Sequence, residues 1–96
     1  MMAKIETSPF EAADYLATAE DIAAYLAAYL EDSTAEEFRK ALDTVARSRG
    51  IADLAKCTGV TRAGIYKALG PDGNPSFETI RQLLTALGLR LTVEAA

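Results

Sequence analysis

The 96-residue chain contains no histidine, no tryptophan and a single cysteine. Without histidine and with one thiol, it offers neither the ligand set of a zinc site nor an imidazole general base. Cys57 has no second cysteine with which to form an intramolecular disulfide, and this is typical of a reducing cytoplasm. We expect Cys57 to be a small buried apolar residue rather than a redox switch. No metal and no cofactor are expected.

Long apolar runs are also missing, and none approaches the about 20 residues that cross a bilayer. Residues 1–7 contain one lysine and no apolar segment, so we expect no signal peptide there. A nucleophile–base pair and a phosphate-binding glycine loop are absent too, so an enzyme is the least expected class. Half of the residues are apolar, enough for the core of one domain that spans residues 1–96.

Charge is divided unevenly along the chain, although the net charge is only −4. Residues 1–38 carry one basic and nine acidic side chains, whereas residues 39–93 carry nine basic and four acidic ones. Opposite signs in the two halves suggest two kinds of partner, a polyanion for the basic half and a basic surface for the acidic half. The acidic side chains could equally do no more than solvate helix faces.

Helix-start signals divide the acidic N-terminal region, residues 8–33, from the helix that follows it. A capping box at residues 8–11, with proline at the first helical position, begins a short helix that runs to about residue 16. Thr18 caps a second helix, and a capping box at residues 34–37 begins a third helix, which ends at Gly50. The second helix carries one continuous apolar stripe, formed by Ile22, Tyr25, Leu26, Tyr29 and Leu30.

Residues 51–69 predict a short helix, a tight turn at Gly59 and a second short helix capped by Thr61. The residues expected to face inward are Leu54, Ala55, Val60, Ile65 and Leu69. This is the layout of a helix-turn-helix, in which the second helix is free to enter the major groove of DNA. We therefore expect DNA binding, with residues 34–88 forming the helix-turn-helix core.

The second of these short helices supplies most candidate DNA-binding residues. Its first turn has no acidic residue, so its N-terminus keeps its attraction for phosphate. Arg62 could bind guanine bidentately or hold a phosphate, whereas Lys67 is the expected phosphate contact. Tyr66 could pack beside the core or reach the DNA backbone, and Gly64 could allow close approach either to DNA or to another helix. The candidate DNA-binding residues are Lys56, Thr61, Arg62, Ala63, Gly64, Tyr66, Lys67, Asn74 and Ser76.

The C-terminal part begins with residues 70–75, which are dense in turn residues and predict an exposed loop. Ser76 caps a last helix closed by Gly88, with an apolar face made of Phe77, Ile80, Leu83, Leu84 and Leu87. Residues 89–94 alternate apolar and polar, which predicts a short strand. Because no other strand is expected, we predict pairing with the same strand of a second subunit in a two-fold dimer; a frayed tail is the alternative. The dimer contacts would be Leu89, Leu91 and Val93.

Several local motifs carry a resemblance to a known family. They are Ala46-Arg47-Ser48-Arg49-Gly50-Ile51, Gly59-Val60-Thr61-Arg62, Tyr66-Lys67-Ala68-Leu69, Gly73-Asn74-Pro75 and Leu87-Gly88-Leu89-Arg90-Leu91. With these motifs, residues 50–91 resemble the helix-turn-helix core of the lambda-repressor-like (Xre) superfamily. That resemblance implies an all-α fold, a lambda-repressor-like bundle of five to six helices with a short C-terminal strand. More closely, the chain resembles the addiction-module antidote proteins, which are HigA-like antitoxins.

This resemblance implies a cytoplasmic type II antitoxin that neutralises a small RelE/ParE-like toxin and represses its own operon as a homodimer. The toxin would be a small basic protein covered by the helices of residues 8–32, with Tyr15, Tyr25 and Tyr29 as anchors. Tyr25 and Tyr29 also belong to the apolar stripe, so core packing is the better explanation for each. The main alternative is a stand-alone Xre-type transcription regulator without a toxin partner. A helix-turn-helix fold used only for protein contact is a further alternative.

Overall fold

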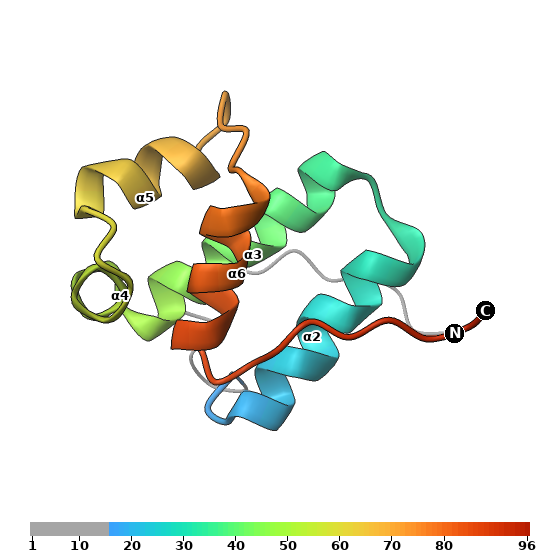
Figure 1. Ribbon diagram of the computed structural model, residues 1–96. Coiled ribbons are helices and arrows are strands. Elements are labelled where there is room, and N and C mark those ends of the chain that lie inside the picture. The colour runs from blue at the N-terminus through green and yellow to red at the C-terminus, as the bar shows by residue number, and fades with distance from the viewer. Residues whose placement is uncertain (1–15) are drawn as a thin grey trace.

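A computed structural model describes residues 16–96 of the chain, and within this range it contains five helices and no strand (Figure 1). The helices are α2 (Ala19–Asp32), α3 (Ala35–Arg49), α4 (Ile51–Thr58), α5 (Arg62–Leu69) and α6 (Phe77–Ala86). The helix expected to begin at Ser8 falls outside the described residues. None of the described helices has the length and apolar character needed to span a membrane.

The helices begin where the capping signals predict. The Thr18 hydroxyl accepts a hydrogen bond from the Asp21 amide at 3.1 Å, and this marks the start of α2. At the start of α3 the capping box is complete, because the Glu37 amide donates to the Thr34 hydroxyl and the Thr34 amide donates to the Glu37 carboxylate. Each such bond satisfies an amide that has no partner within the helix. The predicted starts of these helices are therefore confirmed.

Helix α3 lies at the centre of the fold and contacts α2, α4 and α5, while α6 packs against α4 (Figure 1). The largest fully buried side chains come from α3, α4, α5 and α6, and they are Leu42, Val45, Leu54, Ile65, Leu69 and Leu83. Burying an aliphatic side chain of this size contributes about 1.5–3 kcal/mol. This core spans every helix that follows α2, so the short helices α4 and α5 owe their stability to packing rather than to their own length.

Three predicted core positions lie at the surface instead. Leu30 in the last turn of α2 is 60% exposed, and Phe77 at the first position of α6 is 69% exposed. Both residues lie on the predicted apolar stripes, but each stands at a helix end, Leu30 in the last turn of α2 and Phe77 in the first turn of α6. Cys57 is also exposed, because Ile51 and Leu54 occupy the core-facing side of the eight-residue helix α4. The prediction of a buried cysteine was therefore wrong.

The expected strand at residues 89–94 is not formed in the single chain. Helix α6 ends in a Schellman motif, in which the Leu89 amide donates to the Leu84 carbonyl at 2.8 Å and the Gly88 amide donates to the Thr85 carbonyl at 3.0 Å. The chain then continues beside α2 without regular secondary structure (Figure 1). Leu89 packs against the core, whereas Val93 is fully exposed. A strand needs a partner strand, and the described residues supply none.

Candidate nucleic-acid interface

The turn between α4 and α5 is determined by a few local contacts. Gly59 ends α4 with a φ of +79°, a left-handed conformation that other residues adopt at a cost, and its amide donates to the Ala55 carbonyl. The Thr58 hydroxyl donates to the Leu54 carbonyl at 2.7 Å and accepts from the Val60 amide at 3.1 Å. These bonds satisfy both sides of the turn, so α5 leaves α4 in a defined direction and runs crosswise to it (Figure 1).

The start of α5 differs from the other helix starts in its charge. The Thr61 hydroxyl caps the helix by accepting from the Gly64 amide at 3.0 Å. The first turn of α5 contains no acidic residue, whereas each of the other four described helices carries at least one there. A helix N-terminus attracts anions, and a carboxylate in the first turn would oppose that attraction.

The two faces of α5 are clearly separated. Ile65 and Leu69 are completely buried and hold the helix on the core. The residues exposed on the opposite face, together with the cap, are Thr61, Arg62, Ala63, Tyr66 and Lys67. Five of the candidate DNA-binding residues therefore gather on one accessible surface, to which Arg62 and Lys67 contribute two positive charges. The exposure of Tyr66 favours a role at this surface over a place in the core.

Gly64 is half-buried and has a local reason to lack a side chain. A Cβ atom at this position would lie 3.1 Å from both the Thr61 hydroxyl and a methyl group of Val60. These contacts are tighter than ordinary van der Waals packing. Of the two explanations offered by the sequence, close packing therefore accounts for Gly64, but the atoms it meets belong to the preceding turn and not to another helix.

The remaining candidate DNA-binding residues lie apart from this surface or serve another purpose. Lys56 is exposed on α4. Asn74, in the loop between α5 and α6, lines a groove beside the turn between α2 and α3. Ser76 caps α6, since its hydroxyl accepts from the Thr79 amide at 3.1 Å and donates to the Thr79 hydroxyl at 3.0 Å. The structure therefore commits the Ser76 hydroxyl to a structural hydrogen bond.

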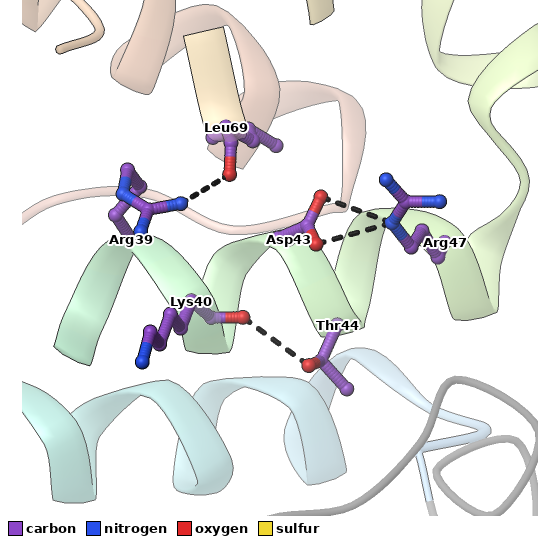
Figure 2. Close-up of polar contacts among 6 residues, drawn as sticks. All are labelled: Arg39, Lys40, Asp43, Thr44, Arg47 and Leu69. Carbon is purple, nitrogen blue, oxygen red and sulfur yellow. Dashed lines mark hydrogen bonds and ion pairs between the residues drawn. The ribbon is translucent and has the colours of Figure 1, made fainter. Parts of the chain in front are cut away.

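Helix α3 contacts α5 through two arginines that sequence reasoning missed, Arg39, whose bond to Leu69 is drawn in Figure 2, and Arg47. Arg39 is 8% exposed, and its guanidinium donates to the backbone carbonyl of Leu69, at the end of α5. Arg47 lies over the ring of Tyr66, with 5.0 Å between the guanidinium carbon and the ring centroid. The sequence did contain a sign that Arg39 is buried, because Arg39 falls on the apolar stripe of α3, three residues before the buried Leu42.

The tyrosines predicted to contact a toxin belong partly to the core. Tyr29 is buried and Tyr25 is half-buried, and their ring centroids lie 5.4 Å apart. Tyr15 lies outside the described residues. The packing of Tyr25 and Tyr29 agrees with their places on the apolar stripe of α2, and a contact of either with a partner stays a prediction. The exposed apolar side chain on this helix is instead Leu30.

Comparison with known proteins assigns the chain to a family. Residues 6–95 match the family described as "probable addiction module antidote protein". A protein of Haemophilus influenzae (strain ATCC 51907 / DSM 11121 / KW20 / Rd), described as uncharacterized, is 36% identical over 85 residues, which cover 88% of each chain. No solved structure matches the chain. An antidote is the antitoxin component of a toxin–antitoxin module, and it has a toxin as its partner. The chain belongs to the addiction module antidote family.

Proposed function

We propose that the chain is a DNA-binding antitoxin that represses its own operon and neutralises a small RelE/ParE-like toxin, without enzymatic activity of its own. The observation that carries the DNA-binding part is the arrangement of α4 and α5. Two short helices are joined at a left-handed glycine, and the second is buried on one face and exposed on the other. This arrangement supports the assignment of α4 and α5 as a helix-turn-helix. In such a unit the free face of α5 enters the major groove.

The side chains on α5 divide into two roles in this proposal. Arg62 lies in the first turn, where a helix in the major groove approaches base edges most closely, and its planar fork can donate two hydrogen bonds to guanine. Lys67 lies in the last turn, where it can neutralise a backbone phosphate. The cap and the first turn of α5 contain no acidic side chain, so the N-terminus of α5 can face phosphate.

The DNA-binding proposal is tested with Arg62→Ala. Binding is measured by fluorescence anisotropy on a duplex from the promoter region upstream of the coding sequence and on a random duplex. If Arg62 reads a base, the variant loses about 1–3 kcal/mol on the promoter duplex and much less on the random one. Equal losses would assign Arg62 to a phosphate. A wild-type protein that binds neither duplex at low salt would refute the DNA-binding proposal.

The toxin-binding part of the proposal rests on the family and on the acidic surface around α2. Within the described residues, positions 16–38 carry no basic side chain and six acidic ones, which are Glu20, Asp21, Glu31, Asp32, Glu36 and Glu37. Two grooves adjoin this surface, and Leu30 and Phe38 line both of them. A basic protein would complement the negative charge of this surface, and an apolar side chain of that protein could occupy one of the two grooves.

Leu30→Lys tests this surface, because it removes an exposed apolar side chain and opposes a basic partner. Phe77→Lys is the matched control, since Phe77 is similarly exposed but does not line these grooves. Each variant is co-expressed with the protein encoded by the adjacent gene, and the amount that co-purifies is measured. We expect loss with Leu30→Lys only. Wild-type protein that binds DNA but recovers no partner would favour the stand-alone Xre-type regulator.

A homodimer completes the proposal, because repressors of this type read two half-sites. In a two-fold pair that reads consecutive major grooves, the two α5 helices would lie about 34 Å apart. The exposed apolar residues Leu91 and Val93 in the C-terminal segment are available for such a contact. Sedimentation of the wild type and of a Val93→Asp variant tests this part. A wild type that sediments as a monomer at all concentrations would refute it.

A further inference from the structure

Arg47 is a basic residue outside the helix pair α4–α5, and its guanidinium contacts two side chains, Tyr66 and Asp43. It lies near the end of α3, yet its guanidinium is placed over the ring of Tyr66 on the exposed face of α5. Tyr66 stands four residues after Arg62, so the two share one side of α5. Arg47 therefore extends the positive surface of α5 onto a neighbouring helix.

Asp43 orients the Arg47 guanidinium without using up its hydrogen-bonding capacity. The Arg47 Nε lies 3.2 Å from Asp43 Oδ1 and 3.1 Å from Oδ2, within one turn of α3 (Figure 2). Both contacts use Nε, so the four N–H groups on the two terminal nitrogens are not committed to Asp43. The Arg47 side chain remains 41% exposed. The Tyr66 ring contacts one face of the guanidinium, and the Asp43 carboxylate binds its Nε. The two terminal nitrogens, Nη1 and Nη2, are therefore the part of Arg47 that is available to a ligand.

A planar pair of N–H donors in a defined orientation suits the tetrahedral oxygens of a phosphate, to which arginine binds bidentately. Arg47 lines a cleft between α3 and the C-terminal end of α5. The other charged side chains that line it are the basic Arg39 and Lys40 and the acidic Glu36 and Asp43. As an ion pair within one turn of α3 and partly exposed to solvent, Arg47 with Asp43 contributes little to stability. The stacking on Tyr66 instead ties the guanidinium to the helix that is proposed to enter DNA.

We propose that Arg47 binds a backbone phosphate of the DNA that α5 enters, and that Asp43 and the Tyr66 ring hold its guanidinium in position. This inference rests on the proposed DNA-binding function and adds a contact from outside the helix pair. Arg47 positions the protein on the duplex and does not read its sequence, because phosphates are the same at every base pair. Its contribution is therefore equal on specific and random DNA.

The test compares wild type, Arg47→Ala, Arg47→Lys and Arg90→Ala for binding to the promoter duplex and a random duplex at several salt concentrations. Arg90 is the matched control because it loses the same charge but lies beside α2. We expect Arg47→Ala to weaken binding about tenfold per protomer on both duplexes and to lower the slope of log affinity against log salt by about one per protomer, that is, by about two for the proposed homodimer. Arg47→Lys should keep the slope but bind more weakly, and Arg90→Ala should keep the slope.

The outcomes separate this inference from the function on which it rests. If the wild type binds DNA and Arg47→Ala has the same salt slope as Arg90→Ala, Arg47 makes no phosphate contact and the inference is overturned. If the wild type binds no DNA, the proposed function itself fails. Thermal melting checks that each variant is folded, and Arg47→Gln, which keeps much of the side-chain length, replaces the alanine variant if that one does not fold.

Discussion

The buried Arg39 provides a sharp test of how α5 is held in place. Its guanidinium donates to the carbonyl of Leu69, one of the carbonyls that the end of α5 leaves without an intrahelical partner. Arg39→Met keeps an unbranched side chain of similar length but removes every donor. The variant therefore measures the contribution of the hydrogen bond separately from that of the packed aliphatic part of the side chain.

The magnitude follows from the surroundings of Arg39. A hydrogen bond from a charged donor is worth about 1.5–3 kcal/mol, and part of that is offset because methionine avoids the cost of burying a charge. The ion pair with Glu36, at 3.8 Å, adds little because Glu36 is exposed. We expect Arg39→Met to lower the free energy of unfolding by about 1–2 kcal/mol. Arg39→Ala should cost about 2 kcal/mol more, since it also removes the buried methylene groups.

Urea denaturation followed by circular dichroism measures these free energies, and thermal melting should show a fall in Tm of about 5–15 °C for Arg39→Met. Lys40→Met is the control, because Lys40 is the adjacent residue of α3 and is exposed. It should leave stability within about 0.5 kcal/mol of wild type. An Arg39→Met protein as stable as wild type would refute the reasoning, since the buried guanidinium would then make no net contribution to holding α5.

Three further substitutions test the helix pair itself, each by urea denaturation against wild type. Leu54→Ala removes a completely buried side chain and should cost about 2–5 kcal/mol; a cost below about 1 kcal/mol would mean that α4 does not pack as described. Thr61→Ala removes the N-cap of α5 and should cost about 0.5–2 kcal/mol, whereas Thr61→Ser should retain most of the stability. Gly59→Ala meets no neighbouring atom, so its expected cost of about 1–2 kcal/mol comes from the left-handed backbone alone, and an unchanged stability would contradict that conformation.

The starts of α2, α3, α5 and α6 could be predicted from the sequence alone. Capping depends on side chains within three or four residues of the helix end, so Thr18, Thr34, Thr61 and Ser76 could be identified as caps without knowledge of the fold. The turn at Gly59 could be predicted for the same reason, because its left-handed conformation is a local property. The pattern of buried and exposed positions along α5 also follows from helical periodicity. The same periodicity places the candidate DNA-binding residues of α5 on one face.

Which end of each apolar stripe is covered and which helices meet could not be predicted from the sequence. Leu30 and Phe77 match the stripes in sequence but are exposed in the structure, and residues 89–94 have a strand-like pattern without a partner strand among the described residues. The bond from Arg39 to Leu69 joins positions thirty residues apart, and the stacking of Arg47 on Tyr66 likewise joins two helices. Contacts between elements depend on how the helices pack in space, and no pattern of neighbouring residues along the chain records that arrangement.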